Sequence, residues 1–368
     1  MTGSTTGEGA GKVGDEVGEV AEAAAAAAAW IGRRAHPLTT FDPGAPTADL
    51  RPLAGIVRDA RVVALGTSTR QSHELSVLSH RMVRFLVEEL GFRSLALEGD
   101  DPVRLGLDAY LATGAGDPRA MLAGARPFWR TEEILGLVRW MRAFNRRHPG
   151  DQVRFVGSVG DPRRPDFRPG DPAGLESALA EDVIRSYERA GERIVWWGGI
   201  AHTADGRPRT VSSSGFAPAT HRSAGGHLRE HFGSGYVSLG QLFHHGTAPY
   251  PLPAPPADFA EAVLGAAGPD AYLLDLRADS PAAVRTWLDA RTRTRLLGPH
   301  YDPADDAGHH LSGGSLAGWF DAVVFTREVT PVRLLPDAET DADTGAGADP
   351  GMDADTRGGG RRAGHHSS

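Results

Sequence analysis

The stretch from residue 61 to residue 100 constrains the fold of this chain more than any other. Its apolar run at 62–65 ends at a glycine and predicts a buried strand. From Ser72 onward, apolar residues recur at helical spacing until a second glycine, which predicts a helix capped by that serine. The run at 94–97 predicts another buried strand. A strand–helix–strand unit favours a parallel pair with a right-handed crossover, so both strands should end at the same edge of one sheet.

Strand and helix patterns alternate along most of the remaining chain. Further apolar runs that predict buried strands lie at 153–157, 193–197, 236–240, 272–276 and 321–325. Helical patterns lie between them, and several helix candidates span about 101–150. This order predicts an α/β fold: a mostly parallel central sheet flanked by helices, with a helical subdomain over the sheet edge. The polar segment 203–221 is long for a connection and predicts a lid, a binding loop or a mobile segment.

Both ends of the chain have the composition of disordered segments. Residues 1–18 are rich in Gly, Thr and Glu, and residues 337–368 alternate Asp, Ala, Thr and Gly before turning basic. Neither segment holds enough apolar residues to offset the entropy lost on ordering. We therefore predict a single α/β domain at 19–336 between two disordered tails.

Charge and composition exclude several kinds of partner and chemistry. The chain carries 39 basic and 47 acidic residues, and its scattered arginines form no basic stripe, so a nucleic-acid partner is not expected. There is no cysteine, which excludes disulfides, thiolate nucleophiles and cysteine-ligated zinc. The alanine-rich run 23–29 follows acidic residues rather than basic ones, so it predicts a helix and not a secretory leader. No other apolar run reaches membrane-spanning length, and we expect a cytoplasmic protein without a membrane partner.

The motifs of common nucleotide, serine-hydrolase and metal sites are absent from the sequence. The turn 66–72 lacks the lysine and the spacing of a phosphate loop, and no G-x-G-x-x-G follows a strand. No G-x-S-x-G elbow is present, which disfavours a Ser-His-Asp hydrolase. The histidine pairs 244–245 and 309–310 have no second cluster at ligand spacing. We therefore expect neither a cofactor nor a metal ion.

Three polar residues, Arg70, Glu98 and His202, stand at or just after predicted strand ends. Ligands of open parallel sheets bind at these ends, which favours a functional role for all three. Arg70 and the neighbouring His73 would be able to hold an anionic group at the start of the predicted helix. Each residue also has a structural alternative: Glu98 is then a satisfied acceptor, His202 a structural or exposed histidine, and His73 and Glu74 cap the helix.

Several stretches of the chain together resemble the erythromycin esterase family, hydrolases that open macrolide lactones. The likeness covers roughly residues 45–335. The stretches that carry it are VVALGTSTRQSHE, LVEELGFRSLALEGD, FWRTEEILGLVRWMRAFN, GGHLREHFGSGYVSLG, AYLLDLR and FDAVVFTREVTPVRLL. The resemblance implies a hydrolase with an erythromycin esterase-like α/β fold.

Two of the family's functional positions are retained in this resemblance, and others are replaced. Glu98 matches the glutamate at the end of the second strand, and His202 matches the last histidine of a W-A-H-N-x-H pattern. The first turn of the family resembles G-E-(A/S)-T-H-G, with a Glu and a His thought to activate water. This chain has Thr67 at the Glu and Arg70 at the His, and Gly199 at the first histidine of the later pattern.

Further positions of this chain also differ from the family's functional pattern. An arginine that usually follows the first-turn histidine falls on Ser79, although Arg81 is close by, and the asparagine of the later pattern is Ile200. Where relatives have G-F-D after the third strand, residues 157–159 read Gly-Ser-Val. A guanidinium stays protonated, so Arg70 cannot replace the missing histidine as a general base.

Three interpretations of the function follow. The leading one is an erythromycin esterase-like hydrolase with an altered active site, acting on a small secondary-metabolite ester or lactone of macrolide or polyketide type. The alternatives are a binding or scaffold protein that has lost hydrolysis, and a repurposed cyclase or lyase that uses Arg70 as an electrophile. In each case the expected partner is a small molecule. The predicted catalytic residues are Glu98, His202 and Arg70, and the predicted substrate-binding residues are Thr67, His73, Glu74, Arg81 and Asp100.

Overall fold

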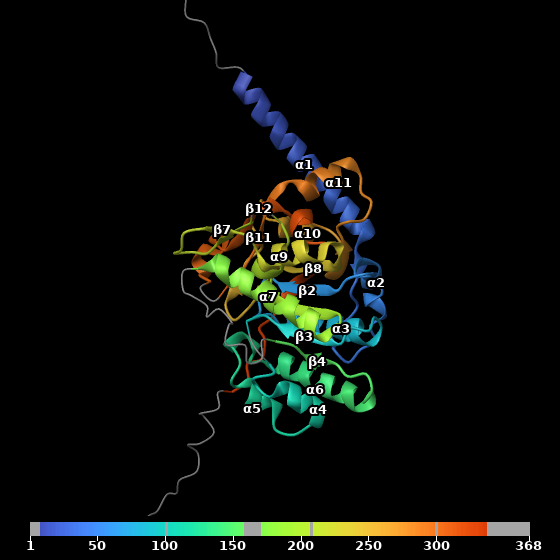
Figure 1. The fold of residues 1–368 in the computed structure, drawn as a ribbon. Coiled ribbons are helices and arrows are strands. Elements are labelled where there is room, and N and C mark those ends of the chain that lie inside the picture. The colour runs from blue at the N-terminus through green and yellow to red at the C-terminus, as the bar shows by residue number, and fades with distance from the viewer. Residues whose placement is uncertain (1–7, 100–101, 158–170, 207–208, 299–300, 337–368) are drawn as a thin grey trace, which may run out of the picture. The chain divides into compact units, whose positions relative to one another are not determined.

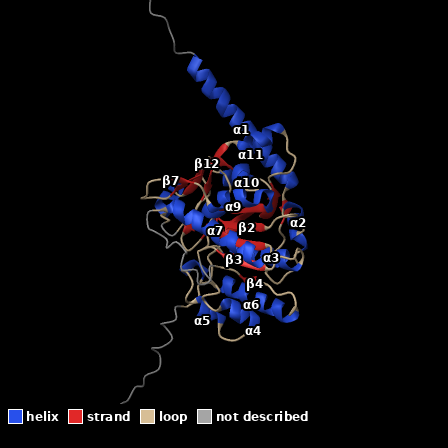
Figure 2. Cartoon of the chain, in the orientation of Figure 1, coloured by secondary structure: helices blue, strands red, loops and turns tan. Residues whose placement is uncertain are grey.

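A computed structural model of the chain describes residues 8–99, 102–157, 171–206, 209–298 and 301–336. Nine strands form a central sheet, which lies among the helices in Figure 2. In spatial order these are β1 (His36–Pro37), β10 (Ala271–Asp275), β13 (Ala322–Val329), β8 (Tyr236–Thr247), β2 (Val62–Thr67), β5 (Ile194–Gly199), β3 (Ser94–Leu97) and β4 (Arg154–Phe155), with β9 (Pro251–Leu252) paired to β8. All pairs from β13 to β4 are parallel, and β1, β9 and β10 pair antiparallel. The predicted mostly parallel sheet is therefore confirmed.

The two strands of the 61–100 unit are parallel but are not neighbours, contrary to our prediction. β5 lies between β2 and β3, with Trp197 in register with Leu65 on one side and Leu97 on the other. The run Ile-Val-Trp-Trp at 194–197 is buried throughout, which explains why β5 takes a central place in the sheet. The carboxyl ends of β2, β5 and β3 still meet at one edge, because all three strands run in the same direction.

Helices precede, connect and flank these strands. They are α1 (Glu8–Arg34), α2 (Pro52–Ile56), α3 (His73–Glu88), α4 (Leu107–Thr113), α5 (Pro118–Leu122), α6 (Glu132–Arg147), α7 (Pro172–Ala190), α8 (Ile200–Thr203), α9 (Ala224–Phe232), α10 (Ala260–Ala266), α11 (Ala282–Asp289) and α12 (Leu316–Trp319). Short 3₁₀ turns lie at Ala48–Leu50, Pro127–Trp129, Gly233–Gly235 and Pro303–Gly308. α1 begins at Glu8, inside the segment 1–18 that we predicted to be disordered. The tail predicted at 337–368 lies outside the described residues.

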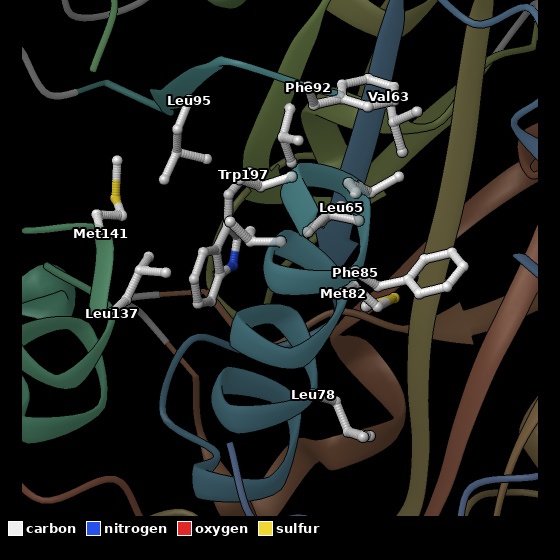
Figure 3. Close-up of a cluster of buried hydrophobic side chains, with 14 of the residues drawn as sticks. Val63, Leu65, Leu78, Met82, Phe85, Phe92, Leu95, Leu137, Met141 and Trp197 are labelled. Carbon is white, nitrogen blue, oxygen red and sulfur yellow. The ribbon is translucent and has the colours of Figure 1, made fainter. Parts of the chain in front are cut away.

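Helices α3 and α6 build the core on one face of the sheet (Figure 3). Leu78 and Met82 of α3, and Leu137 and Met141 of α6, pack in one buried cluster with Trp197 of β5. Burying a side chain of this size stabilises the fold by roughly 1.5–3 kcal/mol. The opposite face is covered by α7 and α9, whose apolar residues form a second cluster with alternate residues of β2, β5 and β8.

The helical segment expected at about 101–150 corresponds to α4, α5 and α6, which lie near β4 at the sheet edge in Figure 1. The side chain of Asp108 in α4 accepts a hydrogen bond from the backbone N–H of Phe155 in β4, at 3.0 Å. This contact caps the edge strand and holds α4 beside it.

A second sheet replaces the long loop that we predicted at 203–221. The antiparallel strands β6 (Arg209–Ser212) and β7 (Ala219–His221) form a hairpin that pairs with β12 (His310–Ser315), which in turn pairs with β11 (Arg291–Arg295). All four strands are polar or glycine-rich, so they give none of the apolar runs by which buried strands are predicted. The hairpin forms part of the wall of the candidate site.

Within the part of the chain that the structure describes, no helix has the length and apolar character needed to cross a membrane.

Candidate functional site

A cavity of about 280 Å³ opens at the carboxyl ends of β2 and β5. Its walls come from the turn after β2, the start of α7, α8, the β6–β7 hairpin and the segment after β11. The lining residues are Thr67, Thr69, Arg70, Pro172, Leu175, Glu176, Gly199, Ala201, His202, Val211, Ser213, Ala219, His221, Leu296, Leu297 and Gly298. This is the edge at which ligands bind to open α/β sheets.

Arg70 and Glu98 form an ion pair at this edge. The Nη2 of Arg70, in the turn between β2 and α3, donates to Oε2 of Glu98, which directly follows β3. The same oxygen accepts the backbone N–H of Gly199 at 2.6 Å. The guanidinium of Arg70 also lies over the ring of Phe128, 4.3 Å from its centre, and this contact fixes its plane. Burial alone would raise the pKa of Glu98, but Arg70, His202 and the Gly199 N–H together lower it below its usual value.

Two glycines at the end of β5 make room for this ion pair. A Cβ atom at Gly198 would lie 2.7 Å from Oε2 of Glu98, and one at Gly199 would lie 3.0 Å from Nη2 of Arg70. Side chains at these two positions would therefore displace the carboxylate and the guanidinium. Gly199 is also where the family resemblance places a histidine. The glycine leaves free the space that the large side chain of Arg70 needs.

His202, in the short helix α8, bridges two buried carboxylates. Its Nδ1 lies 2.9 Å from Oε1 of Glu176, and its Nε2 lies 3.5 Å from Oε1 of Glu98. Burial opposes the charged imidazolium, but the two carboxylates outweigh this effect and raise the pKa of His202 above 6.5. His202 is therefore held by Glu176 on one side and faces Glu98 on the other.

Glu176, in α7, joins four elements of the fold. Besides His202, its carboxylate accepts the backbone N–H of Ala224 in α9 at 2.8 Å and a hydrogen bond from Arg209 in β6. The Nε2 of His221 in β7 lies 3.5 Å from Oε1. Burial would raise the pKa of Glu176, but these donors, His202 first among them, lower it well below its usual range. Glu176 is thus a buried carboxylate that stays ionised.

The other residues predicted from the sequence divide into two groups. Thr67 lines the cavity, but its hydroxyl donates to the carbonyl of Gly198 at 3.3 Å. His73 does not line the cavity, and its Nδ1 contacts Oε1 of Glu133 at 2.7 Å. Asp100 lies outside the described residues.

Glu74 and Arg81 do not line the cavity either, because both are engaged in structural contacts. The carboxylate of Glu74 accepts the N–H and the hydroxyl of Thr330, each at 2.6 Å. Arg81 is fully buried and binds both carboxylate oxygens of Asp49, at 2.7 and 3.0 Å, as well as the carbonyl of Thr40. These contacts fix α3 to β13 and to the loop before α2. The structure thus brings Arg70, Glu98, His202 and Thr67 together and places His73, Glu74 and Arg81 elsewhere.

Sequence reasoning missed Glu176, Arg209 and His221. A signal for Glu176 was available, because it shares one face of α7 with Leu179 and Val183, and a glutamate on an apolar face needs a buried partner. Arg209 and His221 gave no signal, because they belong to strands that the sequence did not predict. Within the described ranges, no three His, Asp or Glu side chains are grouped so as to hold a metal ion.

Fold and site together define an α/β protein with a buried network of carboxylates, guanidiniums and imidazoles at the carboxyl edge of a mostly parallel sheet. The erythromycin esterase family model matches residues 87–166 and 170–329. The chain therefore belongs to the erythromycin esterase family.

Individual relatives match shorter stretches of sequence. YbfO of Bacillus subtilis (strain 168) is 30% identical over 129 residues, which are 35% of this chain and 28% of that protein. Erythromycin esterase type II of Escherichia coli is 27% identical over 128 residues, which are 35% of this chain and 30% of that protein. The matched stretches thus span less than a third of either relative.

Three solved structures share the fold over most of their length. A Bacillus cereus protein has a TM-score of 0.69 at 21% identity, covering 86% of this chain and 99% of its own. A succinoglycan biosynthesis protein has a TM-score of 0.68 at 20% identity, covering 85% and 98%. A mutant of the erythromycin esterase EreC in its open conformation has a TM-score of 0.58 at 14% identity, covering 80% and 98%. These likenesses concern the fold alone.

Proposed function

We propose that this protein hydrolyses a small ester or lactone, with His202 as the group that moves protons and Arg70 as the group that holds the carbonyl oxygen. The observation that carries the proposal is that Arg70 and His202 line one cavity of the fold, with the Glu98 carboxylate against both of them. Membership of a family of hydrolases supports the reaction class. The replaced positions, Thr67 and Arg70, support a site that differs from that of its relatives.

His202 is the only one of these three groups suited to accept a proton. Arg70 stays protonated at any working pH, and the lowered pKa of Glu98 makes that carboxylate a weak base. The hydrogen bond between Nδ1 of His202 and Glu176 leaves Nε2 as the atom that exchanges protons. Because its pKa is raised, His202 acts as a base only in the fraction of molecules in which it is neutral.

The reaction then proceeds as an addition followed by an elimination. Nε2 of His202 takes a proton from water while the water oxygen bonds to the carbonyl carbon, and the negative charge that develops on the carbonyl oxygen is held by Arg70. The bond between carbon and the leaving oxygen breaks, and that oxygen receives the proton from His202. The products are an alcohol and an acid that ionises to the carboxylate; for a lactone both groups remain in one molecule.

A secondary metabolite of macrolide or polyketide type is the substrate that the family membership favours. Two relatives are named for erythromycin, one of them among the sequence matches and one among the solved structures. We carry the ester or lactone bond over to this chain as the proposed target, in a small-molecule substrate.

An activity screen with matched histidine variants tests the proposal. Purified protein is incubated with a panel of esters, small lactones and macrolides, and products are detected by mass spectrometry. We expect hydrolysis of at least one compound, a loss of tenfold or more in His202→Ala, and no loss in His231→Ala, which alters an exposed histidine of α9. Tight binding without turnover in the parent protein would contradict the proposal and favour the binding-protein alternative.

A further inference from the structure

The cavity is apolar over much of its wall and also carries charged and polar side chains. Leu175, Val211, Leu296 and Leu297 contribute to its walls, while Arg70 and His202 lie at the edge formed by β2 and β5. Such a surface fits a ligand with one polar end and a hydrocarbon body. The inference below rests on the proposed function, because it names the class of substrate for the same site.

The charged side chains of the site differ in how much of each is exposed. Arg70 and His202 line the cavity with 18% and 20% of their side chains exposed. Glu176 also lines the cavity but is only 3% exposed, and Glu98, at 8%, is not among the lining residues. An oxygen of a ligand at this end therefore has more of the guanidinium and the imidazole to contact than of either carboxylate.

The charge of this cluster depends on one proton. Arg70 and Arg209 balance Glu98 and Glu176, so the four groups together are neutral. Protonation of His202 adds one positive charge. The carboxylates that His202 contacts, Glu98 and Glu176, are already balanced by the two arginines. Among the described lining residues, His221 is the remaining ionisable group, and it contacts the same oxygen of Glu176. The site is therefore matched to a neutral ligand when His202 is neutral and to a single negative charge when His202 is protonated.

The volume of the cavity limits the size of the ligand. The cavity that the described residues bound has a volume of about 280 Å³. This volume lies just below the range of roughly 300–1,000 Å³ that is typical of sites for drug-sized molecules. A cavity of this size would hold only a part of a large macrolide. A short aliphatic chain with one carboxyl group would be.

We propose that this cavity binds a small aliphatic monocarboxylate, with its carboxylate on Arg70 and protonated His202 and its chain against the apolar wall, and that the substrates are neutral esters or lactones of such acids. Hydrolysis of the neutral ester by water yields the alcohol, the carboxylate and one proton. The carboxylate then stays bound most tightly while His202 carries a proton. The acid half of the substrate, rather than the alcohol half, is therefore the part that the cavity recognises.

Calorimetric titration of the full chain with sodium hexanoate tests this inference without requiring turnover. Across a series from about pH 6 to about pH 9, we expect one hexanoate per chain, with binding that weakens by tenfold or more as His202 loses its proton. Arg70→Gln should weaken hexanoate binding at least tenfold, and Arg58→Gln, an exposed arginine between α2 and β2, should leave it unchanged. At the low-pH end of the series, where His202 is protonated, hexanol and hexylammonium should not bind measurably.

A second variant covers the case in which Arg70→Gln fails to fold. Leu175→Phe fills part of the apolar wall and should abolish binding of hexanoate while leaving that of the shorter butyrate. Absence of hexanoate binding at every pH, or binding that grows stronger as pH rises, would overturn the inference even if esters are hydrolysed. Hexanoate binding that weakens with rising pH, without any ester hydrolysis, would instead uphold the inference and refute the proposed reaction.

Discussion

Replacing Glu176 by glutamine removes one negative charge from a cluster that is almost wholly shielded from water. Glu176 is 3% exposed, and its ion-pair partner Arg209 is fully buried. The glutamine oxygen would still accept the N–H of Ala224, so the perturbation is chiefly the loss of charge. Breaking a buried pair by removing one partner typically costs about 3–5 kcal/mol, because the other charge is left uncompensated. We expect a loss of this size in the free energy of unfolding for Glu176→Gln.

Urea denaturation at neutral pH measures this loss, and a double variant controls for it. Arg209→Met removes the uncompensated charge, so Glu176→Gln combined with Arg209→Met should recover most of the lost stability. A loss below about 1 kcal/mol in Glu176→Gln, or a double variant that is less stable than both single variants, would refute the buried charge network. The histidine NMR signals of the single variant provide a second measurement: the pKa of His202 should fall, because Glu176 is the largest of the effects that raise it.

Three further predictions follow from the site. This protein should open the erythromycin ring about 10²–10⁴-fold more slowly than a family member that retains the Glu and His of the first turn, because Arg70 cannot act as a base. Ring opening at an equal rate in a liquid-chromatography assay would contradict this. Because the pKa of His202 is raised on folding, this residue contributes stability that is fully present below pH 6.5 and is lost as pH rises through the folded pKa. The difference in unfolding free energy between the parent and His202→Gln should therefore shrink with rising pH. A difference that stays constant with pH would exclude the effect. Gly198→Ala should lower the free energy of unfolding by about 1–3 kcal/mol in a thermal or urea unfolding assay, since the added Cβ would lie 2.7 Å from Glu98. Gly136→Ala in α6, which has open space around it, should instead raise that free energy by about 0.5–1 kcal/mol. Equal effects at the two glycines would show that the close approach at Gly198 is relaxed.

The parts of the fold that were predictable from the sequence are those buried on both faces. Runs such as 62–65 and 194–197 are apolar throughout because helices cover both sides of the sheet, and they identify the parallel strands directly. The order of the strands was not predictable in the same way. The insertion of β5 between β2 and β3 depends on contacts between residues far apart in sequence, which local patterns do not record.

The candidate site shows the same division. Arg70, Glu98 and His202 were identified because each stands at a strand end, and strand direction alone brings such ends together. Glu176 was missed because its role depends on the packing of α7 against β6, β7 and α9. Arg81 was predicted to bind substrate because it lies close to Ser79, where the family pattern places an arginine; in the structure its guanidinium binds Asp49 and backbone carbonyls of the loop before α2.

The pH dependence of kcat/KM for ester or lactone hydrolysis tests the role of His202 most directly. If His202 must be neutral to accept a proton from water, kcat/KM should rise with pH through an apparent pKa above 6.5, because Glu176 and Glu98 raise the pKa of this histidine. The rise should shift to lower pH in Glu98→Gln, which removes one of the two carboxylates, and should vanish in His202→Ala. A kcat/KM that is independent of pH in this range, or that falls as pH increases, would contradict the assignment of His202 as the proton acceptor.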